Sequence, residues 1–195
     1  MITLPASPPP SGASPALIDF GFILRPSTGA GALRVNRPGS RWLVKFSYPP
    51  MRPDVARVFI SRLIEAKSAG LRIKYPLQVS QGNPGAALVD GGGAAGTSLP
   101  VKGLTPHYLA KEGYWLSVTD AAGVKYLHNV RATASADAAG KVTLTIRPPL
   151  RAPLVNGDAI ELAAPMIEGL VTSDIAWPIV PDQVIDLSFS VEEAA

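Results

Sequence analysis

The chain contains no cysteine and only two histidines, and this scarcity limits the chemistry it can perform. Without cysteine there is no disulfide framework, no thiolate zinc site and no cysteine nucleophile. His107 and His128 are too few for a metal site, and neither Asp120 nor Asp137 stands at a ligand-like spacing from them. We therefore expect neither a metal nor a cofactor.

Charged residues are also scarce, at 17% of the chain. The net charge of +3 is spread along the sequence without a block of like charges, which argues against a specific nucleic-acid surface. No basic segment precedes an apolar stretch at the N-terminus, and no apolar run reaches about 18 residues, so neither an export signal nor membrane insertion is predicted. A surface with so few charges suits close contact with neighbouring molecules.

Short alternating apolar runs separated by proline and glycine dominate the chain, which has 20 prolines and 18 glycines. The clearest run is "SRWLVKFSY", in which Trp42, Val44, Phe46 and Tyr48 share one face. Such runs predict a mainly β fold: a β-sandwich with one flanking amphipathic helix and an inserted small β-barrel or sandwich.

One helix is predicted, over residues 53–69. Pro53 and Asp54 are typical of a first helical turn, and Gly70 is typical of a helix end. Apolar residues recur at three- and four-residue steps, which predicts a buried face. Its members are Val55, Ala56, Phe59, Ile60, Leu63, Ile64 and Ala66.

The order of these patterns predicts three parts. Residues 1–16 are rich in proline and serine and are expected to form an extended arm. Residues 17–80 and 166–195 are expected to form the β-sandwich core, to which the last strand returns beside Trp42 and the helix. Residues 81–165 are expected to form the inserted barrel. Within it, strands are predicted over 114–118, 124–132, 142–146 and 159–162, joined by turns that contain Gly, Asp or Pro.

The glycine-rich stretch from Gln81 to Leu104 does not match a phosphate-binding loop, because it lacks the Gly-Lys-Ser/Thr ending and precedes no evident helix. We expect it to be a mobile loop.

No catalytic residues are predicted. There is no Gly-x-Ser-x-Gly motif, and the carboxylates show no spacing that selects a pair. An alternative function comes from the aromatic residues Tyr114, Trp115 and Tyr126, with Tyr108 and Trp177, which could line a sugar-binding face. Aromatic residues on short strands more often belong to a core or an interface.

Several motifs follow one another in the second half of the chain. They are "ALVDGGGAAGTSLPVKGL", "KEGYWLSV" and "KYLHNVRATASADAAGKVTLTIRPPLRAPLVNGDAIEL". This series resembles a module of distal tail and tail-tip proteins of long-tailed, siphovirus-like bacteriophages and prophages, strongly over residues 85–165. The matching residues are Leu127, His128, Val130, Ala136, Asp137, Gly140, Thr143, Leu144, Ile146, Pro148, Pro149, Leu150, Arg151, Gly157, Asp158, Ala159 and Leu162. At "KEGYWLSV" the chain departs from the Gly-Asp that is usual there.

The resemblance implies a non-enzymatic structural protein of the virion tail, assembled in the host cytoplasm. Such proteins form rings, commonly hexameric, that join the tail tube to the baseplate hub or the tail fibres. The implied partners are copies of the chain itself, the tail tube protein, and hub or fibre proteins. The alternatives are a carbohydrate-binding adsorption module that uses Tyr114, Trp115 or Tyr126, and, with less support, a cell-wall hydrolase.

The stretch "PPLR" at residues 148–151 has a physical reading of its own. Proline cannot donate a hydrogen bond to a strand ladder, so the strand before it must end. Arg151 is then placed to cap carbonyls or to form an ion pair across an interface. We predict a barrel corner at this point.

Overall fold

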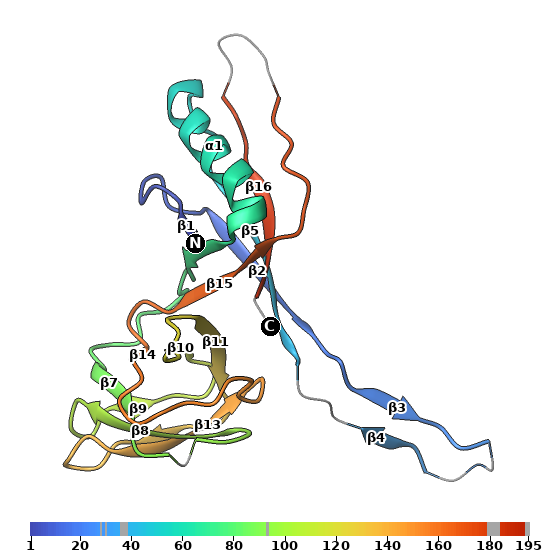
Figure 1. The fold of residues 1–195 in the computed structure, drawn as a ribbon. Helices are drawn as coiled ribbons and strands as arrows, with labels where there is room; N and C mark the ends of the chain where they lie inside the picture. The colour runs from blue at the N-terminus through green and yellow to red at the C-terminus, as the bar shows by residue number, and fades with distance from the viewer. Residues whose placement is uncertain (28, 30, 36–38, 93, 179–183, 194–195) are drawn as a thin grey trace.

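The computed structural model describes residues 1–27, 29, 31–35, 39–92, 94–178 and 184–193. The fold is mainly β, with several sheets and a single helix in the described part of the chain. In Figure 1 one sheet carries the helix, a second sheet curls beneath it, and a long hairpin projects to one side.

The first sheet is assembled from both ends of the chain. Its strand order is β1-β6-β15-β16-β5-β2, and all neighbours are antiparallel except β1 and β6. The strands are β1 (Ile2–Thr3), β2 (Gly12–Ile18), β5 (Arg41–Ser47), β6 (Leu71–Lys74), β15 (Met166–Val171) and β16 (Ser188–Glu193). The predicted return of the last strand is confirmed, because β16 pairs with β5 and places Val191 opposite Val44.

A β-sandwich was predicted for residues 17–80 and 166–195. The strands of this core that the structure describes lie in one sheet, and a sandwich needs two facing sheets, so the sandwich stays a prediction. The predicted arm, residues 1–16, contributes β1 and most of β2 to the same sheet. Its proline-rich middle, residues 4–11, runs between these two strands.

Helix α1 (Pro53–Ala69) has the predicted bounds. Gly70 ends it with φ 76° while its N–H still bonds to the Ala66 carbonyl, a conformation that favours glycine. The helix packs on β15, β6 and β1. Its buried face is narrower than predicted, because Val55 and Ile64 are exposed. The residues that it buries are Ala56, Phe59, Ile60, Leu63 and Ala66.

The second sheet lies within residues 81–165 and is nearly closed into a barrel. Its order is β14-β10-β11-β13-β8-β7, and Val89 N–H bonds to the Asp158 carbonyl where β7 approaches β14. The strands are β7 (Gly85–Val89), β8 (Ser98–Leu104), β10 (Trp115–Thr119), β11 (Lys125–Val130), β13 (Val142–Arg147) and β14 (Ile160–Glu161), beside the short pair β9 (Leu109–Ala110) and β12 (Ala134–Ser135).

The prediction of a mobile loop over residues 81–104 is wrong for about half of that range. Strands β7 and β8 occupy it, and their buried side chains, such as Val89, Leu99 and Val101, belong to the barrel core. The abundance of glycine concealed the alternation. Gly85 and Gly103 lie inside the strand pair, with φ 82° and 76°, beside an irregularity in its register.

Two turns of the barrel use the same four residues, Asp-Ala-Ala-Gly. Asp120 accepts backbone hydrogen bonds from Ala122 and Val124, and Asp137 accepts them from Ala139 and Lys141. Each aspartate thereby satisfies the N–H groups of its own turn, as short acidic side chains commonly do. These turns lead into β11 and β13.

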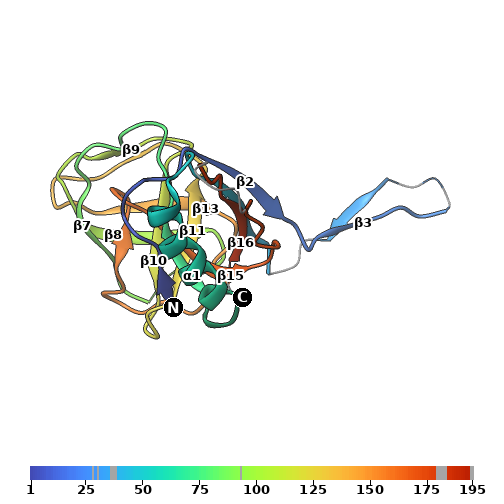
Figure 2. The same cartoon turned by 90° about the horizontal axis from the view of Figure 1, so that it is seen from above.

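The projecting hairpin consists of β3 (Phe22–Leu24) and β4 (Leu33–Val35). The apolar run "LIDFGFIL" at residues 17–24 has the composition of a single strand, but β2 ends at Ile18 and the chain leaves the sheet at Asp19 before β3 begins. Asp19 accepts the Gly21 N–H and pairs with Arg34, which joins the two arms of the hairpin at its base. Viewed from above, the hairpin extends well beyond the body of the molecule (Figure 2).

Candidate functional site

The junction between the two sheets brings together aromatic rings, a buried ion pair and a buried histidine, and it is the candidate site. The side chains of Trp115 in β10 and Leu127 in β11 pack against the core of the first sheet instead of the barrel core. The Trp115 ring lies 4.9 Å from that of Trp42 and 4.6 Å from that of Tyr75, measured between centroids. One aromatic cluster therefore joins the barrel to the sheet that carries the helix.

The prolines at residues 148 and 149 open a gap in the barrel ladder next to this cluster. Strands β11 and β13 pair only at Asn129 with Arg147 and at Val130 with Ile146. Beyond that point proline has no N–H to donate, and β13 turns away. The Leu127 N–H is consequently left on an open edge, where it donates to the carboxylate of Glu193 from strand β16.

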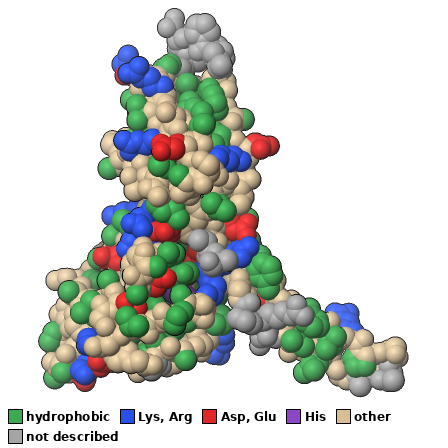
Figure 3. All heavy atoms as spheres, viewed as in Figure 1, with side chains coloured by type: hydrophobic (Ala, Val, Ile, Leu, Met, Phe, Trp, Pro, Cys, Tyr) green, Lys and Arg blue, Asp and Glu red, His purple; other side chains and the backbone are tan. Residues whose placement is uncertain are grey.

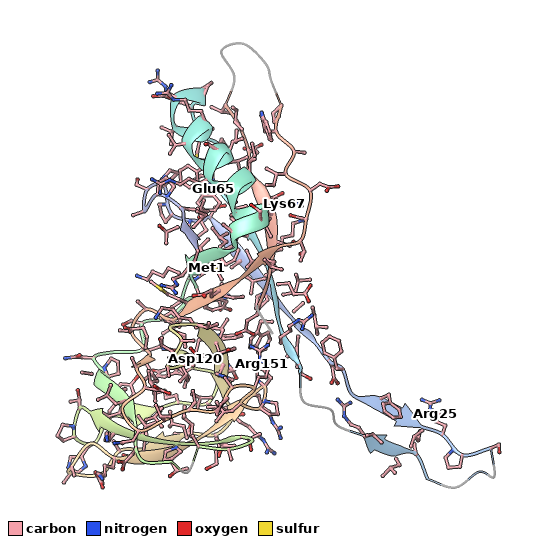
Figure 4. All side chains as sticks on the ribbon, viewed as in Figure 1. Met1, Arg25, Glu65, Lys67, Asp120 and Arg151 are labelled. Carbon is pink, nitrogen blue, oxygen red and sulfur yellow. The ribbon has the colours of Figure 1, made fainter. Side chains whose placement is uncertain are left out.

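Glu193 is the centre of this junction. Its side chain is fully buried, and it also accepts the Trp42 N–H at 3.1 Å. The guanidinium of Arg151, which is 7% exposed, lies 2.7 Å from it and over the ring of Tyr126. Burial raises the pKa of the Glu193 carboxyl, while Arg151 and the two N–H donors act in the opposite direction. Of the two roles predicted for Arg151, the ion pair is the one that forms, and it joins the barrel to strand β16 of the same chain. Figure 4 shows Arg151 between the barrel and the first sheet.

His128 fixes the proline break from the barrel side. Its ring is fully buried, and Nδ1 lies 2.9 Å from the carbonyl oxygen of Pro148. Burial lowers the pKa of His128 to about 4, so the ring is neutral near pH 7 and Nδ1 must carry its proton to donate to that carbonyl. The residue is a structural donor.

Gln81 secures the point where the chain enters the barrel. Its amide Nε2 donates to the carbonyls of Trp115 and Leu162, and its Oε1 accepts the Trp115 N–H at 2.6 Å. The hydroxyl of Tyr108 donates to the Gln81 backbone carbonyl at 2.6 Å. One side chain thus replaces a missing strand partner beside β10.

Replacing Gln81 with alanine should lower the free energy of unfolding by about 2–3 kcal/mol, because it leaves the Trp115 N–H and a buried carbonyl without partners. Denaturant unfolding measures this change. Gln78, which is exposed, is the matched control, and its change to alanine should cost less than about 0.5 kcal/mol. Equal effects at the two positions would show that Gln81 does not hold this junction.

The aromatic residues of the alternative function are not brought together. Tyr114 and Trp115 line a groove of about 720 Å³, but Tyr126 does not. Tyr126 is buried, and its hydroxyl faces Asp120 at 3.3 Å. Trp115 already contacts Trp42 and Tyr75 in the aromatic cluster. A sugar-binding role for these three residues stays untested.

The two histidines do not lie together. His107 is exposed in a turn with φ 60°, whereas His128 is sealed inside the junction. Among the described residues no three His, Asp or Glu side chains gather into a possible metal site, and no helix is both long and apolar enough to cross a membrane.

Sequence reasoning missed Glu193 and Gln81. No carboxylate was singled out from the sequence, although Glu193 continues the inward positions of Leu187, Phe189 and Val191 at a spacing of two. That alternation was the available signal. Gln81 had none, because its role depends on the carbonyls of two distant strands.

Comparison with known proteins adds no relative: no protein-family model matches the chain, and no curated protein matches it significantly.

Proposed function

We propose that this chain is a structural component of a bacteriophage tail, a distal tail or tail-tip protein whose copies form a ring between the tail tube and the baseplate or fibre hub. The proposal includes a sandwich for the first part and a closed barrel for the insertion. The observation that carries it is the projecting hairpin, whose apolar side chains are not covered by any other described residue of the chain.

The hairpin is more apolar than a solvated loop should be. Leu33 is 61% exposed, Ile23 52% and Leu24 47%, and Leu24 pairs directly with Leu33 across the two strands. Figure 3 shows apolar side chains grouped along the projecting hairpin. A contiguous exposed apolar patch commonly marks a protein interface, and a two-stranded ribbon is marginally stable without a packing surface.

Other features favour assembly with copies of the same chain. Strand β2 is an edge of the first sheet and is largely exposed, which leaves one side of its backbone open to a neighbour. A hairpin that projects beyond the body can contact an adjacent subunit, and a closed ring repeats this contact at every interface. In the proposal the tube and the hub proteins would bind the two faces of that ring.

Changing Leu33 to aspartate should convert the assembled protein into folded monomers. The substitution removes an apolar contact and introduces a charge that the interface would have to desolvate, so subunit affinity should fall roughly 100-fold or more. Native mass spectrometry and sedimentation velocity measure this change, and circular dichroism checks that the monomer is folded.

Val155→Asp is the matched control, because Val155 is exposed to a similar degree, 52%, on a loop of the barrel. It should leave the ring intact. Should Leu33→Asp assemble as the unaltered chain does, the hairpin is not the interface and the proposal loses its main support.

A further inference from the structure

The projecting hairpin is tied to the body of the molecule at its base. Strands β3 and β4 form a two-stranded sheet of their own, separate from the sheet that contains β2 and β5. The outgoing leg, residues 19–21, follows β2, and the returning leg, residues 39–40, leads into β5. The direction of the hairpin therefore depends on what the side chains of these two legs contact.

Asp19 joins the two legs to each other and to the hairpin. Its Oδ1 accepts the Gly21 N–H at 2.8 Å and the Ser40 hydroxyl at 3.2 Å, and its Oδ2 accepts a hydrogen bond from the Arg34 guanidinium in β4. The Gly21 N–H and the Arg34 guanidinium hold the pKa of Asp19 below its usual value, so the side chain is a carboxylate at neutral pH. One carboxylate thus contacts three segments.

The backbone is packed tightly at this point. A Cβ at Gly21 would lie 3.0 Å from the Val35 carbonyl oxygen and 3.1 Å from Asp19 Oδ1, which is closer than carbon and oxygen atoms normally pack. Ser40, which donates to Asp19, is only 8% exposed although it is polar. The base of the hairpin is therefore a fitted contact.

Arg41 connects this base to the first sheet. Its Nε and Nη2 lie 2.7 Å and 2.5 Å from Oε1 of Glu192 in the interior strand β16. Its guanidinium carbon also lies 5.1 Å from the centre of the Phe20 ring, within the range of a cation–π contact. Because Phe20 belongs to the outgoing leg, Arg41 holds that leg against the body of the sheet.

We propose that Asp19 and Arg41 are positioning residues, which hold the hairpin at one angle to the first sheet in the single chain, before a neighbour binds. A single exposed ion pair would contribute little. Here the contacts act on both legs and on the sheet, so they oppose rotation in more than one direction. The purpose of this rigidity rests on the proposed function, because a preorganised interface loses less conformational entropy on association.

Pulsed electron paramagnetic resonance measures the angle as a distance within one chain. Since the chain has no cysteine, spin labels attach only to the exposed positions changed by Arg25→Cys in the hairpin and Ser61→Cys in α1. The Leu33→Asp background and dilution with unlabelled protein remove contributions from neighbours. The parent should give one narrow distance distribution, and Asp19→Ala and Arg41→Ala should each widen it about twofold or more, because the freed legs sample many conformations.

Two further variants test the reason for the widening. Asp19→Asn keeps an acceptor oxygen for Gly21 and Ser40 without the charge, so it should widen the distribution less than Asp19→Ala. Asp90→Ala is the control, because Asp90 pairs with Lys141 at 2.9 Å on the barrel, away from both labels, and it should change nothing.

The inference is overturned by a broad distribution in the parent, by an unchanged distribution in Asp19→Ala and Arg41→Ala, or by equal widening in Asp90→Ala. A narrow distribution that only the variants of the hairpin base widen supports it even if the unaltered chain forms no ring. The failure of this inference and the failure of the proposed function are thus distinguishable.

Discussion

Replacing Glu193 with alanine should lower the free energy of unfolding by about 3–5 kcal/mol, the usual cost of removing one partner of a buried ion pair. The change would leave the Arg151 guanidinium buried without a counter-ion, since the described residues offer its nitrogen atoms no partner other than Glu193. It would also free the Leu127 and Trp42 N–H groups. Chemical denaturation followed by tryptophan fluorescence measures the loss.

The adjacent Glu192 provides a matched control. It pairs with Arg41, but both side chains remain about a quarter exposed, at 26% and 23%. Partly exposed pairs contribute about 0–1 kcal/mol, so Glu192→Ala should have a small effect. If the two substitutions cost the same, the buried pair is not what joins the barrel to the sheet.

Acidification from pH 7 to pH 4 should destabilise the protein through His128. The pKa of this imidazole is about 4 in the fold and 6.5 when exposed, so between these values the unfolded chain binds a proton that the folded chain does not. Stability is therefore complete above about pH 6.5 and falls as the pH decreases towards 4. The loss is about 3 kcal/mol at 1.36 kcal/mol per pKa unit.

The measurement is the free energy of unfolding across this pH range for the parent and for His128→Gln. Glutamine retains an amide that can donate to the Pro148 carbonyl but does not titrate. The raised pKa of Glu193 acts in the opposite direction, because its contribution is lost as the pH rises, and it is common to both proteins. The difference between the two curves isolates the histidine. If the free energies of unfolding of the parent and of His128→Gln change with pH in parallel, His128 does not cause the loss of stability in acid.

Local patterns were enough to predict the elements whose burial alternates regularly. The helix over residues 53–69 carries its own start and stop signals, and the strand around Trp42 alternates without interruption apart from Leu43. Strands β7 and β8 were missed because glycine breaks the alternation that the core side chains Val89 and Leu99 otherwise follow. The hairpin was missed because its apolar residues have no buried face to produce a pattern.

The candidate site was predictable only in part. The proline break at residues 148–149 and a pairing role for Arg151 followed from proline's missing N–H and from the geometry of a guanidinium. The partner of Arg151 did not, because Glu193 lies 42 positions away (193 − 151) and reaches the junction through the pairing of β16 with β5 and β15. Such contacts depend on sheet topology, which sequence periodicity does not encode.

The central claim, that the chain is an assembly element of a phage tail, is tested most directly by electron microscopy of the purified protein, alone and mixed with its tail neighbours. The account predicts closed rings in which each hairpin lies on the adjacent copy, and which stack on the tail tube. Single particles that remain monomeric at every concentration and bind no tail component would contradict it.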